Sequence, residues 1–496
     1  MKSNRRDFLK TATFAGAGAV AGTMISGCAP KQPVSNLAGI LDAVKRSHNQ
    51  KFNMSGYGAP VLPVVRIGII GLGDRGSGAV ERLSFIEGVE INALGDKREV
   101  AVKESQKYLA SIGRPAAQEF FGSGDAWKKL VELPEIDLIY TCTPWELHTP
   151  ICVYAMEHGK HVASEVPIAR TIDEAWQLVE TSERTKKHCM MLENCCYDFF
   201  ELLTLNMARQ GMFGDIIHGE GAYIHNLIGL NFNKPDDSRQ TDGGYTDMWR
   251  LRENATRNGN LYPTHGLGPI CQVLNINRGD RMEFLSSVST NDFTMGPREK
   301  ELVASDTFYN EWKDSKFRGN FNTTIIRTAL GKSIMVQHDV SSEHPYSRIH
   351  LVKGTKGMAV KYPRQLIALG ESWLKDEDMA NMWAEHTPEI IKRVGEMAKK
   401  VGGHGGMDFI MDWRLIDCLR NGLPLDQDVY DGAAWSSVAP LSEWSVANNC
   451  QSIEVPDFTG GSWKTNMPHG INLESGGNTA VLEVKEVDAE LQLNVK

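Results

Sequence analysis

The chain has 496 residues, of which 41% are hydrophobic and 23% charged, a composition typical of a globular protein with two or three domains. The formal net charge is -9 and no clustered basic segment is visible, which argues against nucleic acid as a partner. A small neutral or polar substrate is the better expectation.

The first 28 residues form a segment apart from the rest. Arg5 and Arg6 precede Phe-Leu-Lys and a weakly apolar stretch rich in Ala and Gly, which is too short to cross a membrane as a helix. This pattern predicts a twin-arginine export signal, although an arginine pair can also be a solvated N-terminus. Ile25-Ser26-Gly27-Cys28 resembles a lipobox, so we expect lipidation at Cys28 and a place in the periplasm or cell envelope. Residues 29–60 are turn-rich and predict a tether and an N-terminal arm.

The other eight cysteines lack the paired spacing of a zinc site, so we expect no metal. A protein that folds before export does so in a reducing compartment, which favours buried thiols over disulfides. The adjacent Cys195 and Cys196 indicate packing rather than redox chemistry.

A glycine-rich loop follows the first strongly apolar run. The run from Val64 is apolar apart from one arginine, which predicts a central parallel strand buried on both faces. It ends in Gly71, Gly73 and Gly76, spaced as G-x-G-x-x-G before a helical segment, and the next strand candidate ends in Asp96. This arrangement predicts that backbone and a helix N-terminus hold a pyrophosphate while Asp96 binds the adenosine ribose. The carboxylate favours NAD over NADP, although neighbouring Lys97 and Arg98 weaken that preference.

Strand and helix patterns keep alternating up to residue 196. Strands are expected over residues 136–144, 161–167 and 188–194, with helices between them. We therefore predict an α/β Rossmann domain with a doubly wound parallel sheet over residues 61–196. Ligands of such sheets bind at the carboxyl ends of the strands, where this chain carries Trp145 and His148, Glu165 and Val166, and Glu193 and Asn194.

The pattern changes after Tyr197. A helix is followed by segments with a two-residue alternation of apolar and polar side chains and without long helices between them. Residues 197–496 are therefore predicted to form an α+β domain with a mostly antiparallel sheet.

These residues resemble a known superfamily, that of glucose-fructose oxidoreductase and inositol dehydrogenase. The likeness rests on the Rossmann unit, the Glu-x-Pro strand end and the tail PLDQDVYDGAAWSSVAPLSEWSVANN. Within it the chain resembles glycoside hydrolase family 109, through EVP, ENCCYDFFELLTLNMARQGMFGDI, Tyr223, Trp249-Arg250, residues 262–266 and Val455-Pro456-Asp457-Phe458. The resemblance implies an exported, NAD-containing enzyme that cleaves terminal α-N-acetylgalactosamine from a glycan.

One position separates the chain from the dehydrogenases of that superfamily. They usually carry Glu-Lys-Pro, whose lysine serves in proton transfer, whereas this chain has Val166 in the middle position. A dehydrogenase without that ammonium would be impaired, and the glycosidase family shares the substitution.

The resemblance also implies roles for individual residues. The expected cofactor-binding residues include the three glycines of the loop. The full set is Gly71, Gly73, Asp74, Arg75, Gly76, Asp96, Trp145, Glu146, Leu147, His148, Glu165, Val166, Asn194 and Tyr262. The expected substrate-binding residues are Tyr223, Arg250, Tyr262, Pro263, Thr264, His265 and Tyr346. Each has a plainer alternative: the tyrosines could be sheet packing, Arg250 a surface ion pair and His265 a core histidine. His404 and the tryptophans near the C-terminus are expected to be structural.

The implied reaction is a redox-neutral cycle on the sugar. Oxidation at C3 acidifies the C2 proton, a base removes it, the C1 aglycone leaves, water adds, and C3 is reduced again. Such a route needs proton-transfer groups rather than two flanking carboxylates. His265 is the first expectation for that role, with Tyr262 or Tyr197 second. The alternatives are a periplasmic sugar or polyol oxidoreductase with tightly bound NAD(P) and an inert carbohydrate-binding lipoprotein; an oligomer is possible.

Overall fold

The computed structural model describes residues 37–483, apart from residues 38, 237, 239, 241, 242 and 469. The expected export signal, the lipobox with Cys28 and the start of the expected tether therefore lie outside the described residues. The described chain starts with a short helix, α2 (Ile40–Val44), which packs on helix α7 (Ile172–Thr185).

The first sheet has the predicted doubly wound arrangement. Its six strands are all parallel and lie in the order β3-β2-β1-β4-β5-β6. They are β1 (Val65–Ile70), β2 (Val89–Gly95), β3 (Gln118–Phe120), β4 (Leu138–Thr141), β5 (His161–Ser164) and β6 (Cys189–Met191). Helices α3 (Asp74–Leu83), α4 (Glu99–Ser111), α5 (Ala126–Val131), α6 (Trp145–Glu157) and α7 connect them. The winding direction changes between β1 and β4, which is where such sheets bind dinucleotides.

The sequence pattern predicts helices over residues 77–86 and 149–159, and both begin earlier in the structure. Helix α3 begins at Asp74, inside the glycine motif, and α6 begins at Trp145, directly after Pro144. The strand expected to reach residue 144 ends at Thr141, because the proline at the helix N-cap turns the chain into α6. The expected cofactor residues 145–148 consequently form the first turn of a helix at the carboxyl edge of the sheet.

The second sheet is mostly antiparallel, as predicted. Its order is β13-β12-β11-β7-β10-β9-β8-β14, and β7 pairs with β10 in parallel while the other neighbours are antiparallel. The strands are β7 (Ile216–Ile224), β8 (Met282–Ser289), β9 (Asn322–Thr328), β10 (Ser333–Asp339), β11 (Leu351–Gly354), β12 (Gly357–Val360), β13 (Leu366–Leu369) and β14 (Ile453–Glu454). The helices here are α8 (Phe199–Arg209), α9 (Ile228–Asn231), α10 (Trp249–Thr256), α11 (Thr264–Val273), α12 (Met295–Ser305), α13 (Asp376–His386), α14 (Glu389–Val401), α15 (Met407–Asn421) and α16 (Val429–Ala447). Five short 3-10 helices complete the described elements: η1 (Asn194–Tyr197), η2 (Thr246–Met248), η3 (Thr307–Trp312), η4 (His404–Gly406) and η5 (Ser462–Lys464).

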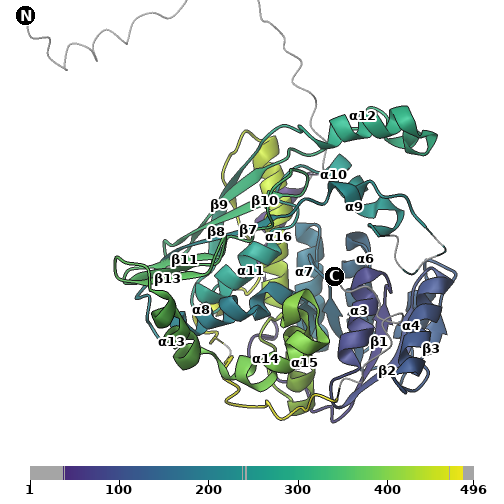
Figure 1. The fold of residues 1–496 in the computed structure, drawn as a ribbon, viewed down its shortest axis with the longest axis horizontal. Coiled ribbons are helices and arrows are strands. Elements are labelled where there is room, and N and C mark those ends of the chain that lie inside the picture. The colour runs from purple at the N-terminus through teal and green to yellow at the C-terminus, as the bar shows by residue number, and fades with distance from the viewer. Residues whose placement is uncertain are drawn as a thin grey trace, which may run out of the picture. The chain divides into compact units, whose positions relative to one another are not determined.

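Helices α16 and α11 join the two sheets. Helix α16 is buried along almost its whole length and packs on α7 from the first sheet's side and on β8 of the second sheet (Figure 1). Helix α11 crosses β7 so closely that a Cβ atom on Gly221 would lie 2.2 Å from the carbonyl oxygen of Gly266. This backbone contact places the start of α11, with His265, next to the end of β7, with Tyr223.

The eight cysteines from Cys142 onward are all free thiols, and seven of them are buried or half-buried while Cys450 is exposed. Among the residues that the structure describes, no helix has the length and apolar character needed to cross a membrane.

Candidate active site

A cavity of about 960 Å³ opens at the carboxyl ends of the first sheet's strands and continues toward the second sheet. One end lies against the loop of Gly71 and Gly73 and against Asp96. The other end lies among side chains of β7, α10 and α11. Of the residues expected from the sequence, it is lined by Gly71, Gly73, Asp74, Arg75, Asp96, Trp145, Glu146, Leu147, His148, Glu165, Val166, Asn194, Tyr223, Arg250, Tyr262 and His265.

The geometry of the glycine loop fits a dinucleotide. A Cβ on Gly71, whose φ is +85°, would lie 2.8 Å from the backbone of Cys142, and one on Gly76 would lie 1.8 Å from the Gly71 carbonyl oxygen. At Gly73, by contrast, the nearest neighbour of such a Cβ is the Arg98 guanidinium at 4.0 Å, so this part of the loop faces open space. Gly76 itself is packed inside α3 and supports the loop from behind. The loop thus has the cradle that a pyrophosphate needs.

Asp96 is fixed by the loop it faces. One carboxylate oxygen accepts a hydrogen bond from the Leu72 backbone N–H at 2.7 Å, and the other accepts one from the Arg98 N–H at 2.8 Å. The carboxylate therefore ties the glycine loop to the end of β2 and stands at the cavity wall where a ribose would bind.

The strand ends beyond the loop are held together by charged and polar contacts. Arg75 donates a hydrogen bond from Nε to Glu165 at 2.7 Å and another from Nη1 to Asp408 at 2.7 Å. The ring of His148 lies 2.7 Å from the carbonyl oxygens of both Thr143 and Pro167, which fixes the two loops that follow β4 and β5. Arg75 and His148 thus organise the cavity wall.

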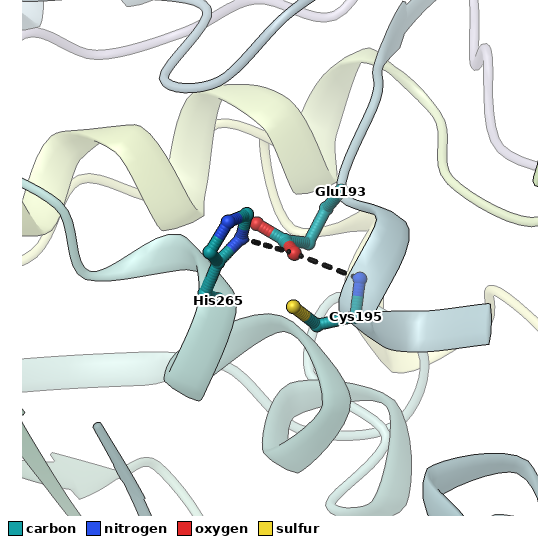
Figure 2. A group of neighbouring side chains, drawn as sticks. All are labelled: Glu193, Cys195 and His265. Carbon is teal, nitrogen blue, oxygen red and sulfur yellow. Dashed lines mark hydrogen bonds and ion pairs between the residues drawn. The ribbon is translucent and has the colours of Figure 1, made fainter. Parts of the chain in front are cut away.

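His265 forms a pair with a buried carboxylate. Figure 2 shows the His265 ring against the Glu193 side chain, with Nδ1 at 2.7 Å from Oε1. The same oxygen accepts a hydrogen bond from the Cys195 N–H at 3.1 Å. Burial alone would raise the pKa of Glu193, but the neighbouring His265 and these hydrogen bonds lower it below its ordinary value. An ionised Glu193 accepts a hydrogen bond from the His265 Nδ1–H and leaves Nε2 free to exchange a proton with a ligand.

Ligand atoms of Glu193, Cys195 and His265 lie within 4.8 Å of one another, a spacing that could also hold a metal ion. Burial raises the pKa of the Cys195 thiol well above its ordinary value, so the sulfur stays protonated and is a poor ligand. Because Glu193 is already engaged with His265, we assign the pair to proton transfer.

The far end of the cavity is an aromatic cage around Arg250. Its guanidinium carbon lies 4.6 Å from the ring centre of Tyr262, 5.1 Å from that of Trp145 and 5.9 Å from that of Tyr223. Nη1 donates to the Tyr245 hydroxyl at 2.6 Å, and the buried Nη2 has no hydrogen-bond partner within the described residues. Burial raises the pKa of both Tyr223 and Tyr262, which keeps them protonated. The cage offers an N–H donor and aromatic faces to a polar ligand.

Besides Gly76, four expected residues lie outside the cavity wall. Pro263 and Thr264 directly precede His265 at the start of α11. The centre of the Tyr346 ring lies 6.3 Å from that of Tyr223 and 5.0 Å from that of His225. Tyr197 is fully buried in the 3-10 helix Asn194–Tyr197, and its hydroxyl donates to Asp426 at 3.4 Å. The structure therefore gives no support to Tyr197 as a proton-transfer group, because its hydroxyl is turned to a structural carboxylate.

Several wall residues have no functional signal in the sequence. Asp408, His225 and Tyr245 line the cavity, and so does His404, for which the sequence predicts a structural role. They come from loops and from α15, far along the chain from the glycine motif and without a local motif of their own.

Comparisons with known proteins agree with this geometry. Residues 65–193 match the oxidoreductase family with an NAD-binding Rossmann fold, and residues 197–465 match the glycosyl hydrolase 109 C-terminal domain. The chain is 43% identical over 475 residues to a glycosyl hydrolase family 109 protein of Shewanella pealeana, covering 95% of this chain and 99% of the relative. It is 48% identical over 412 residues to an α-N-acetylgalactosaminidase of Bacteroides fragilis, covering 82% of this chain and 95% of the relative.

Solved structures share the fold at low sequence identity. Levoglucosan dehydrogenase in complex with NADH and levoglucosan has a TM-score of 0.57 at 16% identity, covering 79% of this chain and 100% of that one. The aldose-aldose oxidoreductase of Caulobacter crescentus has a TM-score of 0.55 at 16% identity, with the same coverage. NAD is therefore the cofactor that the Rossmann part binds, and the family resemblance predicted from the sequence is confirmed. The chain belongs to glycosyl hydrolase family 109.

Proposed function

We propose that this protein hydrolyses terminal α-linked N-acetylgalactosamine from glycans by an NAD-dependent route. Membership of family 109 and the name of the Bacteroides fragilis relative support the substrate. The observation that carries the proposal is that one cavity joins the dinucleotide loop to the His265–Glu193 pair and the Arg250 cage. A cofactor site and a proton-transfer site therefore face the same ligand.

Bound NAD supplies reversible oxidation and reduction of a sugar carbon. The loop of Gly71 and Gly73 would hold its phosphates, and Asp96 its ribose. His265 takes or returns a proton at Nε2 while Glu193 holds the ring through Nδ1. Arg250 donates from Nη2 to a sugar hydroxyl or the acetamido carbonyl, because a buried guanidinium N–H without a partner needs an acceptor.

Val166 cannot transfer a proton, so other residues of the cavity must do so. It is buried at the cavity wall, where the related dehydrogenases carry lysine, and it offers no ionisable group. Proton transfer is therefore left to His265 and to the phenols of Tyr262 and Tyr223. The centres of their rings lie 4.8 Å (Tyr262) and 5.2 Å (Tyr223) from the centre of the His265 ring. This arrangement favours the redox-neutral glycosidase over a sugar or polyol oxidoreductase.

Purified protein without added NAD should be incubated with aryl α-N-acetylgalactosaminide and, in parallel, aryl α-galactoside. We expect release of the aryl group from the first substrate, with no build-up of NADH absorbance. Sustained NADH formation with no aglycone release would identify an oxidoreductase instead.

The N-terminal sequence supports a further proposal on location. Arg5-Arg6 and the lipobox ending in Cys28 support export by the twin-arginine route and lipid anchoring in the cell envelope. When cells are fractionated, the variant with both arginines replaced by lysine should be found in the cytoplasmic fraction. The Cys28→Ser variant should be lost from the membrane fraction. We also propose a Rossmann domain over residues 61–196 and a substrate domain over residues 197–496, a division supported by the family matches over residues 65–193 and 197–465.

A further inference from the structure

A buried carboxylate beyond the expected site joins three segments of the cavity wall. Asp408 is fully buried in the first turn of α15. Its Oδ1 accepts a hydrogen bond from the Asn194 amide at 2.5 Å, and its Oδ2 accepts one from Arg75 at 2.7 Å. Asp408 thus connects the helix after the glycine loop with the end of β6. We call these residues, with Glu165 and His404, the Asp408 cluster.

His404 is the member of the Asp408 cluster with the most exposed side chain. Its Nδ1 lies 2.9 Å from Asp408 Oδ2 and 3.1 Å from Arg75 Nη1, and 53% of its side chain is exposed. It lines the cavity together with Asp74 and Arg75, beside the glycine loop. Because Nδ1 is engaged by Asp408 and Arg75 in either tautomer, Nε2 is the nitrogen available to a ligand.

The backbone of the segment that carries His404 is held in one unusual conformation. Residues 402–406 all have positive φ, between 47° and 107°, and four of the five are glycine. A Cβ on Gly403 would lie 2.7 Å from the Asp408 Cβ, and one on Gly406 would lie 2.9 Å from the backbone of Ala398. The left-handed turn is therefore locked against α14 and α15, and it holds a histidine in a conformation that L-residues rarely adopt.

The charges show how the cluster acts. Arg75 pairs with both Glu165 and Asp408, so two carboxylates neutralise its single charge. Burial opposes ionisation of Asp408, but Arg75, Arg82 and His404 hold its pKa well below the ordinary value. Both carboxylate oxygens of Asp408 are already engaged, by Asn194 on one side and by Arg75 and His404 on the other. It acts through the side chains that it orients.

We propose that Asp408 is a positioning residue for cofactor retention and that His404 is a cofactor-contacting residue. Asp408 fixes the Asn194 amide, Arg75 and the His404 ring in the wall around the dinucleotide. His404 donates or accepts a hydrogen bond to the bound NAD through Nε2. The Asp408 cluster therefore slows the release of bound NAD. This inference rests on NAD binding, and it draws on the proposed function only for the turnover readout.

The chain provides a matched control one helical turn further along α15. Asp412 is also fully buried and accepts hydrogen bonds from Arg82 at 2.7 Å and from the Tyr140 hydroxyl at 2.8 Å. It docks α15 on the first sheet as Asp408 does, but it is not part of the cavity wall. Its partner Arg82 lines the cavity, but an asparagine amide oxygen can still accept a hydrogen bond from that guanidinium, so Asp412→Asn reports the effect of weakened docking of the helix.

The test compares Asp408→Asn, His404→Ala and Asp412→Asn as full-length purified proteins. NAD is released by denaturation and counted per chain, and its loss is followed during dialysis against charcoal, without any glycoside. We expect the first two variants to lose NAD about tenfold to a hundredfold faster than the parent, as for a lost hydrogen bond to a charged group. Asp412→Asn should match the parent in NAD loss while its melting temperature falls.

Equal NAD loss from Asp408→Asn and Asp412→Asn would overturn the positioning role, and parental retention by His404→Ala would overturn the contact. If Asp408→Asn does not accumulate, His404→Ala decides alone, because its exposed side chain can be removed without opening the core. Turnover of an aryl glycoside with excess NAD should recover in His404→Ala. A failure of the glycosidase proposal would remove that readout only, and the NAD measurements would stand.

Discussion

The two ends of the cavity are lined by different kinds of residue. Against the first sheet the wall consists of glycine backbone and paired charges, in which Asp96 holds the Leu72 and Arg98 N–H groups and Arg75 holds two carboxylates. Under the second sheet it consists of aromatic rings around Arg250, one of whose N–H groups has no partner among the described residues. At the first end Asp96 and Arg75 have their partners within the protein, whereas Arg250 at the second end has a donor that a ligand must satisfy.

This difference teaches how one chain can retain one ligand and turn over another. A wall whose charges are already paired keeps its shape when the ligand leaves, which suits a resident cofactor. An unpaired buried donor makes the site favour polar ligands that bring an acceptor, which suits an exchanging sugar. Substitutions at the first end should therefore change retention of NAD, and substitutions at the second should change turnover.

The largest effect is expected at His265, where the two ends meet. His265→Ala should lower turnover by about a hundredfold to ten-thousandfold, the range for loss of a general acid or base. NAD content should stay at the parental value, because the pair with Glu193 lies beyond the glycine loop. Steady-state kinetics and the NAD count together check this expectation. A variant that lost NAD in proportion to its activity would abolish the distinction between the ends.

Arg250 tests the aromatic end alone. Arg250→Lys keeps the charge but removes the planar donors, and we expect kcat/KM to fall by roughly tenfold to a hundredfold, as for a lost hydrogen bond to a charged group. Arg298→Lys, in an exposed pair with Glu301, is the control and should be neutral. Unchanged kinetics for Arg250→Lys would mean that the Nη2 group does not meet the substrate.

Asp96 tests the cofactor end. Asp96→Ala removes the acceptor of the Leu72 N–H as well as the expected ribose contact, so we expect NAD binding to weaken by about 1.5–3 kcal/mol. Dialysis followed by an NAD assay measures the loss, and turnover at saturating NAD should stay close to that of the parent. Full retention of NAD by the variant would show that Asp96 does not bind the ribose.

The smallest effect is expected on folding stability at low pH. It extends the comparison from the cavity to the buried cores beside the first and the second sheet. Burial lowers the pKa of His188, beside the first sheet, and of His350, beside the second, to about 4. Since the unfolded pKa is higher, the unfolded chain binds protons that the folded chain refuses, and stability falls as the pH drops from about 6.5 toward 4.

Each of these histidines should reduce the unfolding free energy by about 1.5 kcal/mol between pH 6.5 and pH 5. His188→Phe should flatten the pH dependence of thermal unfolding by that amount, whereas His158→Phe on the surface should leave it unchanged. An identical pH dependence in the His188→Phe variant would mean that the folded protein already binds a proton there.

How much of this could be predicted from sequence differs between the two ends. The glycine loop, Asp96 and the parallel sheet follow from local spacing, because a dinucleotide fold places its determinants within one strand-helix-strand unit. The start of α6 at Trp145 has no clear signal in the sequence, because Pro144 and Pro150 stand on either side of its first turn. In the second sheet the parallel pairing of β7 with β10 could not be read from the sequence, since alternation is the same for either direction.

The wall residues from distant segments lacked any local signal. Asp408 and Tyr245 meet Arg75 and Arg250 only because α15 and the loop before α10 fold onto the cavity. Glu193 was placed at a strand end, but its partnership with His265, 72 residues later, depends on how α11 crosses β7. Tyr197 shows the reverse case: its side chain lies near the site in sequence, but its hydroxyl donates to the buried Asp426.

The central claim is that the sugar itself is oxidised and deprotonated during hydrolysis. It is tested most directly by hydrolysing an aryl α-N-acetylgalactosaminide in D2O with protein that retains its own NAD, followed by NMR of the released sugar. Exchange of the C2 proton requires its acidification by a neighbouring ketone, and a glycosidase with two carboxylates leaves that bond intact. We predict deuterium at C2 of the released N-acetylgalactosamine. Hydrolysis that leaves C2 fully protonated would contradict the account.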